Sequence, residues 1–238
     1  MLTVVGDFDV AQARKMVEKY FTAIPSVKQP PMPDLAEPKQ EQEKRASKKD
    51  PLAKRPALAF AYHMPERNTP EYYAMGLLDQ ILLQGEDSML HQELVKKRGF
   101  AANVPGGINL LGHMFNYNGP MLWMGYLFHD NGKTADEILA AVDTVIEGLQ
   151  AKPLDQKMLD RAIVKLRSGF YDSLATFNGF GRADLLSSFA LFDDKPERIN
   201  MLEAEFRKVT PELMQRTARE YLRKTNRTVL TIEPAAAK

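Results

Sequence analysis

The sequence predicts an α+β fold, with short strands near the two ends of the chain and a run of helices between them. Two apolar segments rich in β-branched or aromatic residues, 57–63 and 227–232, have the composition of strands. Between them, Thr residues followed by apolar residues at helical spacing mark several helix starts. Hydrophobic residues make up 44% and charged residues 26% of the 238 residues, the balance of an ordinary folded domain.

The first 25 residues are expected to form one strand and one helix. Residues 2–5 are a short apolar run typical of a buried strand. Asp9 is a good N-cap and has Gln12 three residues later, the spacing of a capping box. We therefore expect a helix at Val10–Phe21, which Pro25 ends.

A segment rich in proline and charge follows at 26–55. It contains several prolines, and between residues 39 and 55 the basic side chains outnumber the acidic ones. This composition would suit a basic docking patch, but it favours a solvated linker between two domains. We therefore predict a linker.

Helix and strand signals continue from residue 56 to residue 233. Thr69 before Pro70 favours a helix start, and Thr134 with Glu137 forms a capping box. Gly99 fits the end of a helix that Ser88 is expected to cap. The expected helices span 70–83, 89–98, 135–149, 155–174, 182–193, 196–209 and 211–223, the last capped by Thr210. The expected strands span 57–63, 108–118, 121–129 and 227–232, the middle two joined as a hairpin at Gly119-Pro120.

Composition excludes several classes of function. A net charge of +1 predicts no electrostatic attraction to nucleic acid. The absence of Cys excludes disulfides and thiolate chemistry and is compatible with a bacterial periplasm or a cytoplasm. No apolar run reaches the ~18 residues of a membrane span. Met1 leads directly into a strand-like segment without a signal peptide, which suggests a piece of a longer protein.

The histidines do not have the spacing of a metal site. They are His63, His91, His113 and His129, and none has a second His four residues away with a Glu beside it. His91-Gln92-Glu93 comes nearest and lacks the second His. We therefore expect no metal ligands and no catalytic residues in this chain, and His63 and His113 to be ordinary hydrogen-bonded polar residues.

The stretch 77–104, LLDQILLQGEDSMLHQELVKKRGFAANV, carries a family resemblance. Its pattern is Leu78, Leu82, Gly85, Ser88, Leu90, Leu94, Gly99 and Ala101. The opening VVGDFD and VEKYFTAIP and the closing helix and strand at 202–234 agree with it in order and spacing. Together these features resemble the second domain of the pitrilysin and mitochondrial-processing-peptidase family of zinc proteases.

The resemblance implies a domain organisation. Chains of that family contain two related domains, each a mostly antiparallel sheet covered on one face by helices. Residues 1–25 would be the last strand and helix of an otherwise missing N-terminal domain, and 26–55 the linker. Residues 56–233 would be the C-terminal metallopeptidase-like domain, and 234–238 a tail. A strand at 2–5 without its sheet is expected to pair with another copy, pack on the second domain or be mobile.

The resemblance also implies what this chain lacks. The zinc motif of the family, His-x-x-Glu-His, lies in the first domain, so zinc is expected there and not in this chain. In partners that face the zinc, an Arg and a Tyr of the second domain hold the substrate. Aligned on Gly99, those positions are Val95 and Ala102, which cannot donate the corresponding hydrogen bonds. The chain therefore should not grip substrate in the usual way.

Three functions stay open. The first is the non-catalytic C-terminal domain of a zinc metalloendopeptidase subunit, which walls the substrate chamber and binds polypeptide. The second is a scaffold or assembly domain of an inactive family member, and the third an unrelated α+β binding domain. The expected partners are the N-terminal domain of the same protein, a homologous subunit in a homo- or heterodimer, and a peptide or protein substrate. The chain alone should not be an enzyme.

Several other residues invite a functional interpretation, but each has a simpler structural one. Lys96, Lys97 and Arg98 could replace the lost Arg, yet cations suit a helix C-terminus. Gly106-Gly107 resembles peptide-contacting glycine loops, yet favours a turn before a strand. Residues 178–182 could line a cavity but favour a helix start. The aromatic residues around Trp123 and the 12 Met are expected in the core.

Overall fold

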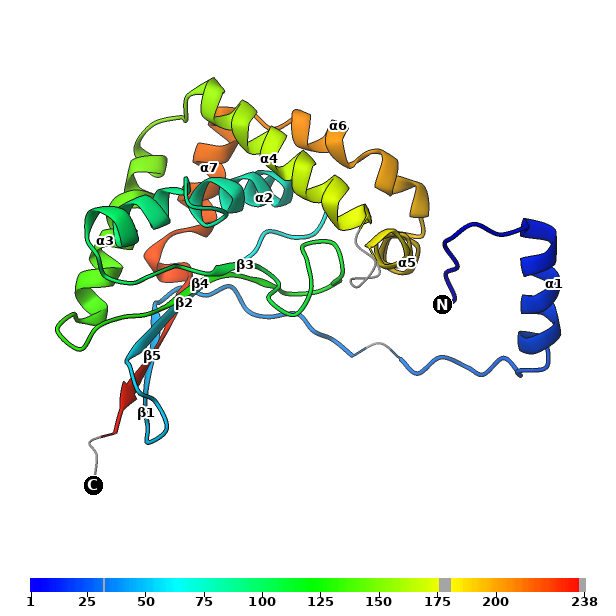
Figure 1. Ribbon diagram of the computed structural model, residues 1–238, viewed down its shortest axis with the longest axis horizontal. Coiled ribbons are helices and arrows are strands. Elements are labelled where there is room, and N and C mark those ends of the chain that lie inside the picture. The colour runs from blue at the N-terminus through cyan, green and yellow to red at the C-terminus, as the bar shows by residue number, and fades with distance from the viewer. Residues whose placement is uncertain (32, 176–180, 236–238) are drawn as a thin grey trace.

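The computed structural model describes residues 1–31, 33–175 and 181–235. One five-stranded sheet forms one layer, and helices pack against one of its faces (Figure 1). This arrangement confirms the α+β fold and the sheet covered on one face. The N-terminal helix lies apart from both layers, at the end of an extended segment (Figure 1).

The sheet has the strand order β1-β5-β2-β4-β3. β2 is the central strand and pairs antiparallel with both β5 and β4, while β3 pairs antiparallel with β4. β1 runs parallel to β5 at the opposite edge. The strands are β1 Lys44–Asp50, β2 Ala57–His63, β3 Gly106–Ile108, β4 Leu122–Phe128 and β5 Arg227–Pro234.

The helices begin where the sequence places caps. The side chains of Asp9, Thr69, Thr134 and Thr210 each accept a backbone hydrogen bond at a helix start, and Thr134 with Glu137 forms the complete capping box. The helices are α1 Val10–Phe21, α2 Pro70–Leu82, α3 Ala135–Ala151, α4 Gln156–Ala175, α5 Gly181–Asp193, α6 Leu202–Arg207 and α7 Pro211–Tyr221. Shorter turns are the π-helix η1 His91–Lys97 and the 3₁₀ helices η2 Pro196–Asn200 and η3 Lys224–Asn226.

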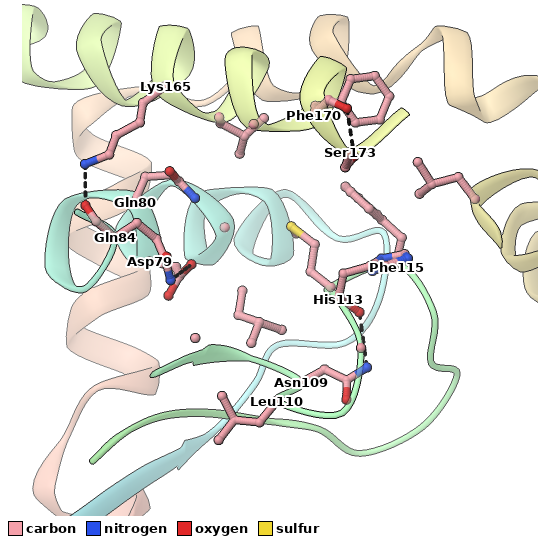
Figure 2. A pocket seen from close by; sticks show the side chains of 18 of the residues that line it. Asp79, Gln80, Gln84, Asn109, Leu110, His113, Phe115, Lys165, Phe170 and Ser173 are labelled. Atoms are coloured by element: carbon pink, nitrogen blue, oxygen red, sulfur yellow. Dashed lines mark hydrogen bonds between the residues drawn. The ribbon is translucent and has the colours of Figure 1, made fainter. Parts of the chain in front are cut away.

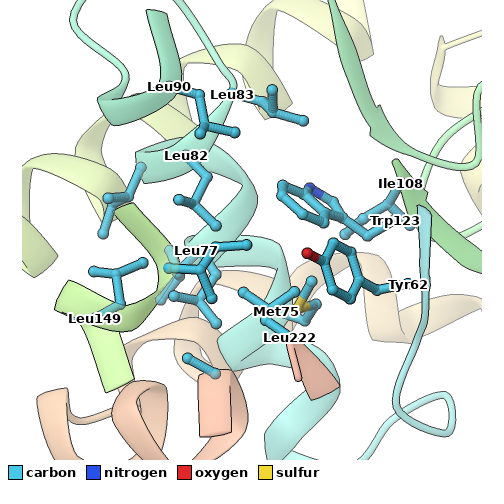
Figure 3. Packing of buried hydrophobic residues seen from close by; sticks show 14 of the residues in the cluster. Tyr62, Met75, Leu77, Leu82, Leu83, Leu90, Ile108, Trp123, Leu149 and Leu222 are labelled. Carbon is cyan, nitrogen blue, oxygen red and sulfur yellow. The ribbon is translucent and has the colours of Figure 1, made fainter. Parts of the chain in front are cut away.

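α2 lies at the centre of the core. Most of its residues are buried, and its apolar side chains pack between the sheet and the surrounding helices. Trp123 of β4 is fully buried, with its ring 5.8 Å from that of Tyr62 on β2 (Figure 3). Alternation along β4 directs Trp123 and Leu127 to the helices and leaves Leu122 and Phe128 on the other face.

The expected linker at 26–55 is wrong for residues 44–50. These residues form β1, which pairs with β5 over its whole length. All but one of the β1 side chains are exposed, so the strand carries no apolar pattern that sequence analysis could detect. Buried Arg227 of β5 also bonds to Glu43 and, at 2.5 Å, to Asp143 of α3, which connects the same segment to the domain.

The expected strand at 2–5 is also wrong. The segment forms no strand with any described residue, and Ser187 Oγ of α5 donates a hydrogen bond to Thr3 Oγ1 at 2.7 Å. α1 has no buried residue, although its apolar residues follow helical spacing. Most of its apolar side chains are exposed, and only Ala13 and Val17 are partly covered.

Four other expectations need correction. The strand expected at 108–118 is β3, which ends at Ile108, because Asn109, His113 and Asn116 then bond to one another in a loop. The helix expected at 196–209 is divided between η2 and α6. The hydroxyl of Ser88 is buried and bonds to none of the described residues, so it does not cap the next helix. Pro234, expected in the tail, belongs to β5, and residues 178–180 lie outside the described residues.

Candidate functional site

A cleft of about 520 Å³ lies between the sheet edge and three helices. One wall is β3 with the loop that follows it, and the others are α2, α4 and the start of α5 (Figure 2). Its lining combines apolar side chains such as Phe115, Leu166 and Phe170 with the polar groups of Asp79, Gln84 and Asn109. This mixture of apolar wall and few polar groups is typical of a ligand site.

β3 is an edge strand whose outer side faces this cleft. It pairs only with β4 in the described sheet. Asn109 N–H donates to Leu122 O and Tyr126 N–H to Pro105 O, so alternate residues of this segment point their polar groups toward β4. The N–H and C=O groups of Gly106 and Ile108 therefore point away from β4. Gln84 Nε2 donates to Gly106 O at 3.3 Å, and no described residue forms a hydrogen bond with the other three groups.

Asp79 of α2 places a buried carboxyl group at this edge. Its residue is 7% exposed, and it accepts hydrogen bonds from Trp123 Nε1 at 2.8 Å and Gln84 Nε2 at 3.1 Å. Burial raises the pKa of Asp79 to about 6, while these two hydrogen bonds and the charge of Lys165 act in the opposite direction. Figure 2 shows Asp79 beside Gln84, below α2 and above β3.

Two side-chain contacts lie on either side of Asp79. Lys165 of α4 donates to the backbone oxygen of Gln84 and, at 2.6 Å, to Asp87 Oδ1. His113 Nε2 lies 2.6 Å from Asp184 Oδ2, which connects the loop after β3 to α5. Both contacts join separate elements of the cleft wall, so they hold its shape.

The positions aligned with the family Arg and Tyr do not line this cleft. Val95 is half-buried against the core, and Ala102 is exposed. The neighbouring cations Lys97 and Arg98 both pair with Glu93, at 2.9 and 2.6 Å. Their charges are thus engaged at the end of η1, as expected for a helix C-terminus.

The histidines lie in four separate places. His63 Nδ1 is 3.3 Å from Glu37, His113 pairs with Asp184, and His129 bonds to the backbone of Asp130. His91 Nε2 is buried and has no hydrogen-bond partner in the part of the chain that the structure describes. Within the described ranges, no three His, Cys, Asp or Glu side chains come together as a metal site. These residues therefore do not fit a zinc ion.

Asp79 is not among the site residues expected from the sequence. The available signal was a lone carboxylate within the apolar run 77–83 of a helix that is otherwise buried. A charged residue at such a position requires a partner or a function. Gly106-Gly107, interpreted as a turn, is in fact the edge strand.

The chain belongs to the family described as the peptidase M16 inactive domain, whose family model matches residues 1–166. This match confirms the family resemblance seen in 77–104. No helix in the described part of the chain is long and apolar enough to cross a membrane.

The zinc protease PqqE of Helicobacter pylori is 21% identical over 238 residues, which cover 98% of this chain and 51% of that protein. Solved structures agree in fold. A protease from Helicobacter pylori has a TM-score of 0.83 at 19% identity, covering 97% of this chain and 54% of its own. The peptidase M16 inactive domain from Pseudomonas fluorescens has a TM-score of 0.76 at 19% identity, and the match covers 98% of this chain and 53% of that one. The chain spans about half the length of these relatives.

Proposed function

We propose that the chain is the non-catalytic C-terminal domain of a zinc metalloendopeptidase subunit that binds extended polypeptide at the β3 edge. The observation that carries this proposal is the outer edge of β3, where the N–H of Gly106 and both backbone polar groups of Ile108 have no hydrogen bond among the described residues and face the cleft. An extended peptide can add a strand to such an edge through main-chain hydrogen bonds. The apolar cleft wall then contacts the peptide side chains.

The uncovered face of the sheet supports a role in the wall of a substrate chamber. Leu122 and Phe128 of β4 and Leu230 of β5 are 37%, 53% and 41% exposed. Large apolar side chains that gather on one exposed face commonly mark an interaction surface. In this proposal the zinc belongs to an N-terminal domain, and the sheet face of this chain faces the same chamber.

The missing substrate-gripping pair favours a second candidate, a scaffold domain of an inactive family member. Val95 and Ala102 supply neither a charged donor nor a hydroxyl, and the cations beside Val95 pair with Glu93. A scaffold domain needs no peptide at β3. Peptide binding therefore separates the two candidates.

The test uses a fluorescein-labelled, uncharged peptide that favours an extended conformation, with anisotropy as the readout. Two analogues carry N-methyl groups on alternate residues, one on each of the two peptide edges. We expect the unmodified peptide to bind and only one analogue to lose binding, because a β-strand donates to its neighbour from alternate residues. Absence of peptide binding, or equal binding by both analogues, would contradict strand addition.

The purified chain also tests whether zinc binding and proteolysis belong to another domain. Incubated with zinc, the chain alone should hold no stoichiometric metal and cleave no unfolded protein, since its described residues form no metal site. Tight stoichiometric zinc, or chelator-sensitive cleavage by the purified chain, would overturn the non-catalytic assignment.

A further inference from the structure

We infer that the cleft binds a cationic side chain, Lys or Arg, of the bound polypeptide, with Asp79 as its counter-ion. This inference rests on the proposed binding of peptide at β3 and adds the class of side chain that is selected. The observation behind it is that the carboxyl group of Asp79 is buried and forms no ion pair with any described residue.

Asp79 makes no ion pair within the described residues. Its two hydrogen-bond donors, the Trp123 indole and the Gln84 amide, are neutral. Lys165 is the cation that acts on Asp79, but its ammonium group bonds to Asp87 and to the Gln84 backbone. A buried carboxylate is costly unless it is paired, so a cation that reaches Asp79 would gain from a charge otherwise left uncompensated.

The hydrogen bond from Trp123 does not by itself explain why residue 79 carries a carboxylate and not a neutral acceptor. An indole N–H needs one neutral acceptor, and a side-chain amide would supply it without a buried charge. An ionised carboxylate has about four acceptor sites, of which these two hydrogen bonds use two. Asp79 therefore has acceptor capacity left for an ammonium or guanidinium group.

Gly107 keeps Asp79 close to the edge strand. A Cβ on Gly107 would lie 3.7 Å from Asp79 Oδ1 and 3.2 Å from Gln84 Nε2, and its φ of +142° also disfavours a side chain. No side chain of β3 therefore stands between its backbone and Asp79 at this position. A peptide strand added to β3 would have this carboxyl group beside the edge to which it bonds.

The walls suit the stem of a long cation. Phe115, Leu166 and Phe170 line the cleft together with Gly169, where an added Cβ would meet nothing within 4 Å. Lys and Arg place their apolar stems along such surfaces and bring the charge to a polar partner. At the far side of the cleft, the Nε2 atom of His113 is already bonded to Asp184 Oδ2.

The experiment compares matched peptides in the same anisotropy assay. One pair differs only in Lys against norleucine, and the other only in Arg against citrulline. We expect the cationic member to bind at least about tenfold more tightly, since a hydrogen bond to a charged group contributes about 1.5 kcal/mol or more. In Asp79→Asn this preference should disappear, while Asp160→Asn, which removes an exposed carboxylate of α4, should retain it.

Trp123 gives an independent readout because it is the only tryptophan and donates to Asp79. Its indole ¹H–¹⁵N signal should shift with pH as Asp79 titrates. The Lys peptide should lower the midpoint of that titration in the unmodified chain, and the norleucine peptide should not. This measurement needs no variant, so it holds even where Asp79→Asn folds poorly.

The outcomes separate the two proposals. Equal binding of both peptide pairs with no change in the indole midpoint overturns the cationic site and leaves strand addition intact. Failure of every peptide to bind overturns both. A Lys or Arg preference that survives in Asp79→Asn also overturns the assignment of Asp79.

Discussion

Two buried carboxyl groups in this domain differ in what surrounds them. Asp193 and Arg67 are each 5% exposed as side chains and form an ion pair at 3.0 Å. Burial would raise the pKa of Asp193, but hydrogen bonds from Arg67 and Asn68 together with nearby positive charge lower it below its usual value. Asp79 has only neutral donors, so its pKa is raised instead. The first carboxylate supports the fold, and the second is available to a ligand.

Asp79→Asn should alter how stability depends on pH. The pKa of Asp79 is about 6 in the folded chain against 3.8 for the ordinary group, so between these values the folded state holds the extra proton. Its contribution therefore becomes unfavourable as pH rises from 4 to 6 and is fully unfavourable above about 6. A pKa difference of about two units corresponds to roughly 2–3 kcal/mol in the free energy of unfolding.

Urea unfolding of both proteins at pH 4 and pH 7 measures this effect. The variant should gain on the order of 2 kcal/mol relative to the original chain on going from pH 4 to pH 7. Parallel stability profiles for the two proteins would show that Asp79 titrates normally in the fold.

Arg67→Ala should destabilise the domain by about 3–5 kcal/mol, because it leaves the buried Asp193 carboxylate without its main partner. The change also removes donors to the backbone oxygens of Phe115 and Tyr117. The control is Arg14→Ala, whose exposed pair with Glu18 on α1 should contribute less than about 0.5 kcal/mol. Chemical denaturation compares them, and similar small losses would refute the buried-pair account.

At the scale of elements, helices were predicted better than strands. Helix starts depend on a capping side chain within a few residues, and Asp9, Thr69, Thr134 and Thr210 were all recognised from sequence. Strand β1 depends on β5, which lies far away in the chain, and its own side chains are polar. β3 is short and glycine-rich, so its pairing with β4 leaves little local signal.

Thr134→Ala should destabilise α3 by about 1 kcal/mol, since Thr134 Oγ1 accepts from Glu137 N–H at 3.2 Å and completes the capping box. Thr144→Ala, within the same helix and exposed, should change the free energy of unfolding by less than about 0.5 kcal/mol. Thermal or urea unfolding measures both. Equal effects would mean that helix propensity, not capping, governs the result.

At the scale of the whole molecule, the structure shifts the boundary expected for the domain. Gln40 Nε2 donates to Arg227 O at 2.7 Å, and β1 covers the edge of β5. The stable unit should therefore begin near residue 39 and not at residue 56. α1 and the extended segment after it contribute little burial.

Two truncated chains test this boundary. A chain of residues 39–238 should unfold within about 0.5 kcal/mol of the full chain, because the removed part buries almost no apolar surface. A chain of residues 56–238 should lose several kcal/mol and aggregate more readily, because it exposes the β5 edge and removes Glu43 from buried Arg227. Equal stability of both chains would restore the boundary at residue 56.

The sequence by itself determined the α+β class, the capped helices, the family and the absence of metal-ligand spacing, because these depend on local pattern and residue type. Tertiary structure alone decided that β1 joins the sheet, that Gly106 and Ile108 present an open edge, and that Asp79 lies beside it. Each of these depends on contacts between residues distant in the chain. Such contacts leave little trace in local hydrophobic periodicity.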